Sequence, residues 1–181
     1  MERPEEVGKK GRVDADEDVR ILAFLCNWCS YAGADLAGVS RLQYPPNVLD
    51  VRVMCTGTIS PYFVVKAFQE GMDGVLIAGC HIGDCHYLKG NYMTAKRFQV
   101  LREALRFLGL EEGRLRLEWV SAAEGEKYAE VVRSFTEQVK ALGPSPLRRE
   151  RSGVGMPGKD ARLKSEGGGA GGMDPGAGVA G

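Results

Sequence analysis

Apolar and polar positions along the middle of the chain follow two alternating patterns. Short segments rich in branched apolar residues predict four strands, over residues 20–25, 49–54, 74–79 and 115–120. Between and after them, apolar residues recur every three or four positions and predict four helices, over residues 30–43, 61–70, 93–109 and 123–142. Ser60 followed by Pro61 is typical of a helix start. This regular alternation predicts an α/β fold, with a parallel sheet covered by helices on both faces.

The composition of each predicted strand indicates its place in the sheet. The segment GVLIAG at 74–79 is continuously apolar and ILAFL at 21–25 is nearly so, as expected for central strands buried on both faces. The segments at 49–54 and 115–120 alternate apolar and charged residues, as edge strands can. With right-handed crossover connections, these features favour the strand order 2-1-3-4. We therefore predict a single flavodoxin-like three-layer domain with a four-stranded parallel sheet.

Composition divides the chain into three zones. Residues 1–18 are polar and charged, and we expect them to form an N-terminal extension. Residues 19–142 carry the patterned segments and are expected to form the α/β domain. Residues 143–181 contain no aromatic residue and twelve of the 25 glycines. A segment of this kind cannot bury enough apolar surface to offset its chain entropy, so it is predicted to be a disordered Gly/Pro-rich tail.

The charge balance and the apolar segments exclude several kinds of partner. The 24 basic and 24 acidic residues cancel, so no global field favours nucleic acid or an anionic membrane. No apolar run approaches the roughly 20 residues that a membrane span needs. The N-terminus is charged and lacks the apolar core of a secretory signal. We therefore expect a cytoplasmic protein without nucleic-acid or membrane partners.

The cysteines carry most of the chemical information in the chain. Three of them, Cys26, Cys55 and Cys80, each close a predicted strand, so a parallel sheet would bring them to the edge where such folds place their sites. In a reducing compartment, clustered cysteines are typically metal-binding or catalytic, and an odd number argues against a closed disulfide framework. Thiolates favour zinc, copper(I) or iron–sulfur clusters. The candidate ligands are Cys26, Cys29, Cys55, Cys80 and Cys85.

The predicted strand order groups these thiols and leaves the type of centre open. Cys26 and Cys29 would face Cys80 and Cys85 across the crevice between strands 1 and 3. Cys55 would lie one strand further away, and we expect its replacement to matter less. Four thiolates can hold a structural zinc ion or a 2Fe-2S cluster, and spacing alone does not separate these. A thioredoxin-like thiol–disulfide protein is a further alternative, because a C-x-x-C motif that opens a helix suits that chemistry.

Three longer motifs resemble a known family. They are FLCNWCSYAGADLAGVSRLQYPP (24–46), VRVMCTG (51–57) and GCHIGDCHYLKGNYMTAKR (79–97). They resemble the delta subunit of methyl-viologen-reducing hydrogenase, a family also attached to some formate dehydrogenases. The resemblance covers residues 19–142 and matches all five cysteines to those of the family.

That resemblance implies an iron–sulfur domain and a role in anaerobic metabolism. The chain would be an electron-transfer subunit with a 2Fe-2S cluster. It would relay electrons between a hydrogenase, or formate dehydrogenase, module and the flavin-containing A subunit of a heterodisulfide reductase. The alternatives kept beside it are a thiol–disulfide redox protein and a zinc-stabilised interaction module.

Other residues near the cysteines are predicted to assist and not to bind metal. His81 and His86 each follow a cysteine directly, and adjacent side chains in an extended segment point apart. We expect these histidines to form hydrogen bonds or to contact a partner. Trp28 lies between the first two cysteines and would either shield the centre or contact a partner. The chain has no dinucleotide fingerprint and no acid–base pair beside a nucleophile, so we identify no catalytic residue.

Overall fold

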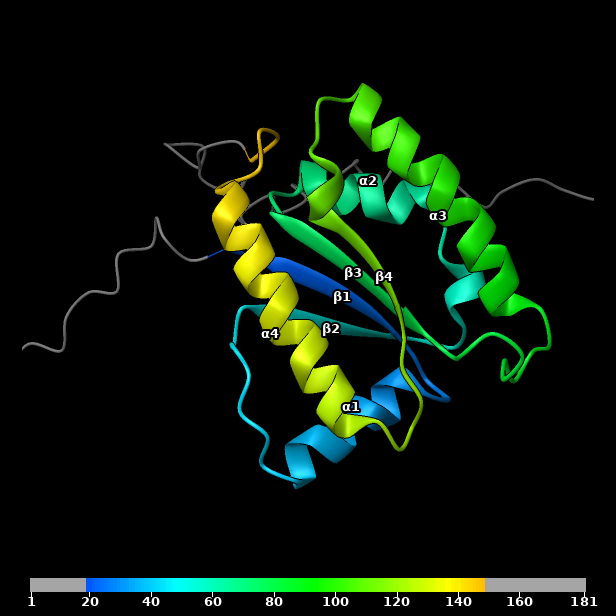
Figure 1. Ribbon diagram of the computed structural model, residues 1–181. Coiled ribbons are helices and arrows are strands. Elements are labelled where there is room, and N and C mark those ends of the chain that lie inside the picture. The colour runs from blue at the N-terminus through cyan, green and yellow to red at the C-terminus, as the bar shows by residue number, and fades with distance from the viewer. Residues whose placement is uncertain (1–18, 149–181) are drawn as a thin grey trace, which may run out of the picture. The chain divides into compact units, whose positions relative to one another are not determined.

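A computed structural model describes residues 19–148 as an α/β domain. Its four strands are parallel and lie in the order β2-β1-β3-β4 (Figure 1), which confirms the predicted fold class and strand order. The predicted N-terminal extension and residues 149–181 of the predicted tail lie outside the described residues. The strands are β1 (Ile21–Cys26), β2 (Val48–Val53), β3 (Gly74–Gly79) and β4 (Leu115–Trp119).

Four helices complete the three layers that the sequence predicts. Helices α1 and α4 cover one face of the sheet, and α2 and α3 cover the other (Figure 1). Single turns of 3-10 helix, η1 (Thr56–Thr58) and η2 (Glu112–Arg114), precede α2 and β4. No helix among the described residues is long and apolar enough to cross a membrane. The helices are α1 (Ser30–Val39), α2 (Pro61–Gln69), α3 (Gly90–Phe107) and α4 (Gly125–Leu142).

The helix ends show where local pattern was a sufficient guide and where it was not. The Ser60 hydroxyl accepts a hydrogen bond from the amide of Tyr62, so the predicted start of α2 is confirmed. Helix α1 ends at Val39, four residues before the predicted end. Helix α3 begins at Gly90, three residues before the predicted start, because its first turn packs against the cysteine loops.

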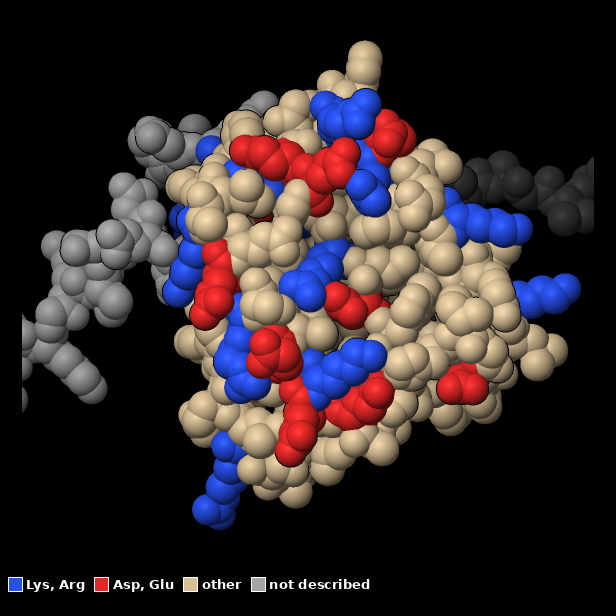
Figure 2. Space-filling view, in the orientation of Figure 1, with Lys and Arg blue, Asp and Glu red and all other residues tan. Residues whose placement is uncertain are grey.

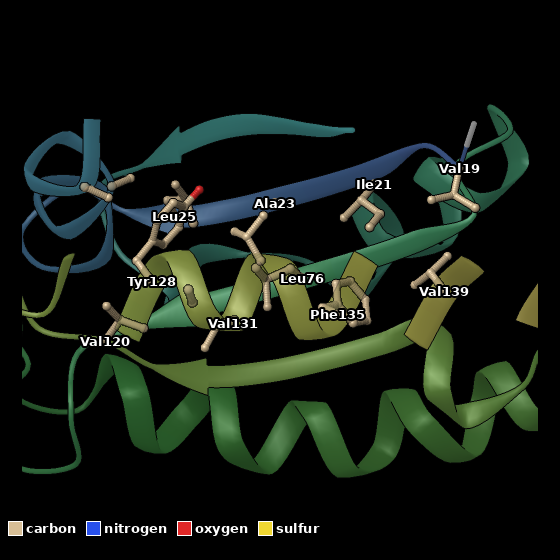
Figure 3. Close-up of a cluster of buried hydrophobic side chains, with 14 residues drawn as sticks. Val19, Ile21, Ala23, Leu25, Leu76, Val120, Tyr128, Val131, Phe135 and Val139 are labelled. Atoms are coloured by element: carbon tan, nitrogen blue, oxygen red, sulfur yellow. The ribbon is translucent and has the colours of Figure 1, made fainter. Parts of the chain in front are cut away.

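Two apolar clusters on opposite faces of the sheet form the core. Alternate residues of β1, such as Ala23 and Leu25, point toward α1 and α4 and pack there with Tyr128 and Phe135 of α4 (Figure 3). Phe24 points the other way, into the cluster beneath α2 and α3. Strand β3 is buried at all six positions, as expected for a central strand. Full burial of each large apolar side chain contributes about 1.5–3 kcal/mol.

At the amino edge of the sheet, a network of buried charges holds the last described residues. The carboxylate of Asp73 accepts hydrogen bonds from the Ser145 amide at 2.8 Å and from the Arg148 guanidinium at 3.1 Å. Arg114, 1% exposed, donates to the carbonyl oxygens of Leu142, Gly143 and Pro144. Residues 143–148, which composition assigns to the tail, therefore pack against the domain.

Candidate metal centre

The structure gathers all five cysteines at the carboxyl edge of the sheet. Cys26 ends β1, and Cys29 stands directly before α1. Cys55 follows β2 and precedes η1, while Cys80 directly follows β3. Cys85 lies in the loop between β3 and α3. All five side chains are buried, with exposed fractions of 2–6%.

The sulfur atoms form two groups, which we call the sulfur triad and the sulfur pair. The triad consists of Cys26, Cys29 and Cys80, whose sulfurs all lie within 4.8 Å of one another. Within it, the sulfurs of Cys26 and Cys80 are 3.7 Å apart. The pair consists of Cys55 and Cys85, whose sulfurs are 3.8 Å apart. The grouping therefore differs from the expected one, in which Cys80 and Cys85 act together and Cys55 lies further away.

The turn between Cys80 and Cys85 accounts for this grouping. The Asp84 amide donates to the carbonyl oxygen of His81 at 3.0 Å, and Gly83 adopts a φ of 101°. A positive φ of this kind is strained for residues with a side chain, so glycine suits the turn. The turn leaves Cys80 beside β1 and carries Cys85 to the end of β2, where it meets Cys55. Cys55 thus has a neighbouring thiol at a distance comparable to those in the triad.

Ser30 supports the triad and escaped notice in the sequence. Its side chain is fully buried at the start of α1. The Ser30 hydroxyl accepts a hydrogen bond from the Cys26 amide at 2.8 Å and donates one to the carbonyl oxygen of Ala78 at 2.6 Å. It therefore joins the ends of β1 and β3 directly beneath the sulfurs. Its position immediately after the C-x2-C motif was the available signal.

Two glycines let the backbone approach the sulfur pair. A Cβ atom on Gly57 would lie 2.7 Å from the Cα atom of Gly90, so η1 and the start of α3 touch backbone to backbone. A Cβ atom on Gly90 would overlap the sulfurs of both Cys55 and Cys85. The Gly57 amide donates to the Cys55 sulfur at 3.4 Å. Glycine at these positions provides the space that the two sulfurs occupy.

Asn91 connects the cysteine loop to α3. The residue is 1% exposed, and its side-chain amide donates to the carbonyl oxygens of His81, at 2.6 Å, and Cys80, at 3.3 Å. Its side-chain oxygen accepts a hydrogen bond from the Tyr92 amide at 2.9 Å. One buried residue thus holds the carboxyl end of β3 against the first turn of α3. Because the sequence places Asn91 outside the predicted helix, its role could not be seen there.

Neighbouring groups and burial shift the pKa values of the three triad thiols in different directions. The neighbouring Cys29 thiol favours the ionised form of Cys26, and together with the Trp28 amide it outweighs burial and lowers the pKa of Cys26 to about 6. The proximity of Cys26, together with burial, raises the pKa of Cys29. Burial also raises the pKa of Cys80. Within the triad, Cys26 is therefore the thiol whose surroundings most favour ionisation.

The two thiols of the sulfur pair also differ. Burial opposes ionisation of Cys85, but the backbone amides of Asn91, Tyr87 and Gly90 point at its sulfur and lower its pKa overall. At Cys55, burial outweighs the hydrogen bond from the Gly57 amide and raises the pKa of the thiol to about 11. Each group thus contains one thiol whose pKa is lowered beside others whose pKa is raised. A cation would stabilise the remaining thiolates, because metals bind the deprotonated form.

Both histidines have partners away from the sulfurs. The Nε2 atom of His81 lies 2.7 Å from a carboxylate oxygen of Glu124, which also accepts a hydrogen bond from the Ser121 amide. The Ser121 amide and then His81 lower the pKa of Glu124 to about 2. The ring of His86 stacks on Trp28 with 3.9 Å between ring centroids. Among the described residues, neither ring belongs to the group of converging ligand atoms.

An open pocket of about 280 Å³ lies beside the triad. The indole nitrogen of Trp28 lies 3.4 Å from the Tyr87 hydroxyl and so bridges the two cysteine loops at its rim. Trp28 is 44% exposed, and Leu88 nearby is more exposed still. Charged side chains of both signs gather over α4, whereas the surface over the start of α3 is mostly uncharged (Figure 2). The pocket is lined by Trp28, Cys29, Cys80, His81, Asp84, His86, Ser121 and Ala122.

The fold and the site together define a small α/β protein with a cysteine-lined centre at the carboxyl edge of its sheet. Residues 21–143 match the family described as methyl-viologen-reducing hydrogenase, delta subunit. The match covers most of the domain, and the chain belongs to this family. The resemblance seen in the three cysteine motifs is thereby confirmed.

Relatives of two kinds share the sequence. The chain is 51% identical over 129 residues to the iron-sulfur D subunit of the vhc F420-non-reducing hydrogenase of Methanococcus voltae, covering 71% of this chain and 90% of the relative. The corresponding iron-sulfur protein of Archaeoglobus profundus is 49% identical, with 71% and 94% covered. The chain is also 47% identical over 138 residues to the A subunit of the ferredoxin:CoB-CoM heterodisulfide reductase of Methanosarcina mazei. That alignment covers 75% of this chain but 17% of the relative.

Proposed function

We propose that this chain is an electron-transfer subunit that holds one 2Fe-2S cluster on four of its five thiols. The observation that carries the proposal is the gathering of five buried sulfurs into a triad and a pair. A 2Fe-2S cluster takes two thiolates on each iron, and the two groups offer one set for each iron. Soft sulfur donors such as these favour zinc or iron–sulfur chemistry over harder metals.

The distances favour a ligand set that includes Cys55. In this set, Cys55 and Cys85 would hold one iron, and two thiols of the triad would hold the other. The missing side chain of Gly90 makes room for both sulfurs of the pair, and the amides of Gly57 and Asn91 point at them. Such amide hydrogen bonds stabilise the negative charge on sulfur and are among the features that set the reduction potential. The fifth thiol would be the remaining member of the triad, whose three sulfurs all lie within 4.8 Å of one another.

The chain's own residues bind, position and shield the cluster, which supplies the redox chemistry when bound. Ser30 and Asn91 hold the strand ends in place, and burial of the thiols limits their contact with water. Trp28 and Tyr87 form an exposed aromatic rim next to the sulfurs and are suited to contact a redox partner. A partner bound at this rim would bring its redox centre close to the cluster, as electron transfer requires.

The names of the relatives support the proposed partners. Several are iron–sulfur subunits of F420-non-reducing hydrogenases, which favours a hydrogenase as the electron donor. The A subunit of a heterodisulfide reductase includes a segment 47% identical to this chain. Because that segment and the rest of the A subunit form one polypeptide, we infer that this chain contacts a similar A subunit. We therefore propose a relay in the cytoplasm from a hydrogenase module to a flavoprotein that resembles this A subunit. A formate dehydrogenase module is the other donor that the family resemblance implies.

The alternative chemistries differ in their support. Thiol–disulfide exchange requires an accessible thiolate, but Cys26 and Cys29 are both buried, so the thioredoxin-like alternative is disfavoured. A structural zinc ion is the second candidate, because three sulfurs of the triad already lie within 4.8 Å of one another. Zinc would need one further ligand from the sulfur pair.

Metal analysis of anaerobically purified protein separates these candidates. We expect about two irons and two labile sulfides per chain, together with visible charge-transfer absorption. Electron paramagnetic resonance of the reduced protein should show the single unpaired spin of a reduced 2Fe-2S cluster. One zinc ion per chain without sulfide would overturn the proposal in favour of the structural zinc.

A further inference from the structure

The outer edge of β2 is free within residues 19–148. There, β2 pairs with β1 alone, in parallel. The carbonyl oxygens of Asn47 and Val53 accept hydrogen bonds from the chain at either end of β1. Because amide and carbonyl groups alternate in direction along a strand, those of Val48, Asp50 and Arg52 point toward the free edge. An edge strand with unpaired backbone groups is a ready template for a further strand.

The two faces of β2 have different side chains. Asp50 and Arg52 lie on the face of α1 and α4, where Asp50 accepts a hydrogen bond from Tyr128. Leu49 and Val51 lie on the other face, which α2 does not cover at this edge. They are 58% and 38% exposed. An apolar face and a free backbone edge thus coincide on one strand.

We propose that β2 pairs with β2 of a second copy of this chain, antiparallel, about a two-fold axis at Val51. In this register Asp50 of each copy lies opposite Arg52 of the other, so two cross-strand ion pairs form. On the other face Leu49 lies opposite Val53, and Val51 lies opposite itself. The segment VLDVRV is therefore complementary to its own reverse in both charge and apolar character. The pairing would join two sheets into one of eight strands.

The charges of Asp50 and Arg52 favour this register over the two neighbouring registers. A two-fold axis perpendicular to the sheet does not exchange the two faces of the sheet. The two strands can therefore shift only between registers in which each residue stays on its own face. Moving the axis to Asp50 would place the two Asp50 carboxylates opposite each other. Moving it to Arg52 would place the two guanidinium groups opposite each other. Like charges directly across a strand pair are destabilising, so the axis at Val51 is favoured over these two neighbouring positions.

Neither charge of β2 is already used in an ion pair within the described residues. The guanidinium of Arg52 lies over the ring of Tyr31, 5.1 Å from its centroid. Burial raises the pKa of Asp50, although the Tyr128 hydroxyl opposes this. A guanidinium brought opposite Asp50 would favour its ionised form. Both groups therefore gain an oppositely charged partner when the second copy binds.

This pairing leaves the cysteine edge open for electron transfer. Cys55 lies four residues from the axis, and at about 3.3 Å per residue the two copies of Cys55 would be roughly 26 Å apart, on opposite sides of the axis. The two metal centres would thus face away from each other. The proposal does not depend on the cofactor or on the electron-transfer partners.

Charge exchange at positions 50 and 52 tests the proposal on the full-length chain. Arg52→Glu alone places like charges opposite each other, and so does Asp50→Arg alone. Mixed one to one, however, the two variants present two acids on one strand and two bases on the other. Sedimentation velocity over a range of concentrations measures each state, and circular dichroism and thermal melting verify folding.

The expected result is a reversible dimer for the natural sequence. Each single variant should raise the dimer dissociation constant by about tenfold or more, and the equimolar mixture should restore dimers. A natural chain that stays monomeric at every concentration, or a mixture that stays monomeric, would overturn the proposal. If either charge variant fails to fold, Val51→Lys serves instead, because it would place two ammonium groups at the axis and must abolish the dimer. A normal iron content in a monomeric natural chain would reject the dimer but leave the proposed function standing.

Discussion

The two edges of the sheet both bury polar side chains, but these side chains find their interaction partners in different ways. At the amino edge, Asp73 and Arg114 find all their partners within the chain. At the carboxyl edge, the sulfurs meet one another at 3.7–3.8 Å and receive a few backbone amides. The amino edge thus satisfies its charges internally and stabilises the domain. The carboxyl edge leaves the buried sulfurs mainly to one another, as expected of a site that binds a cation.

The backbone reflects the same division. Helices α2, α3 and α4 end at the amino edge with glycines in the left-handed region, Gly71, Gly109 and Gly143. These tight ends allow short, closed connections back into the sheet. The loops at the carboxyl edge carry the cysteines. In parallel sheets this is the edge where strands end and sites form, so loop sequence is free to serve chemistry there.

The largest expected effect comes from breaking the sulfur pair. Cys85→Ser and Cys55→Ser should each abolish visible absorption and most of the bound iron, because each removes one of the two ligands that we propose for one iron. Iron content, sulfide content and the electron paramagnetic resonance of the reduced variants measure the loss. If Cys55→Ser keeps a full cluster, the ligand set excludes Cys55 and the original expectation from the sequence is restored.

The next effect should come from filling the space beside the pair. Gly90→Ala would push a methyl group into the sulfurs of Cys55 and Cys85, so we expect the variant to fold but to bind little iron. Gly38→Ala is the matched control, since a Cβ atom there meets nothing within 4 Å. The control should keep its cluster. A Gly90→Ala variant with full iron content would show that the sulfurs do not occupy this position when loaded.

Breaking the amino edge should affect stability and spare the cluster. Arg114→Met leaves the carbonyl oxygens of Leu142, Gly143 and Pro144 without their donor, and loss of a buried charged partner typically costs about 3–5 kcal/mol. Denaturant unfolding measures the change. Arg106→Met, at a residue whose side chain is 64% exposed, should cost less than about 1 kcal/mol. Equal losses for the two variants would contradict the role assigned to the buried network.

The smallest effect concerns the surface beside the triad. Trp28→Ala should weaken association with the flavin-containing partner by about 2 kcal/mol while the isolated protein keeps its visible spectrum, because Trp28 is an exposed aromatic residue at the rim. Titration of the purified partner against cluster-loaded protein measures this. Val100→Ala, at another exposed apolar residue, is the control. Loss of the spectrum would instead make Trp28 a shield for the cluster.

Much of the fold could be predicted because its signals are local or follow general rules. The apolar composition of β1 and β3 identified the central strands, and the handedness of crossovers then supplied the order. The cap at Ser60 is a contact between neighbours in the chain. The early start of α3 was missed, because Gly90 and Asn91 are poor helix formers in sequence and become helical through contacts with the cysteine loops.

The order of residues was enough to identify which side chains could serve as ligands and at which edge of the sheet they would lie. Strand ends are local features, and parallel strands necessarily end together. Packing in three dimensions was needed to show that Cys55 joins Cys85 and that Cys80 joins Cys26 and Cys29. That grouping depends on a turn at Gly83 and on the close approach of Gly57 to Gly90. Contacts between segments distant in the chain leave no periodic pattern, so they become visible only once the strands are packed together.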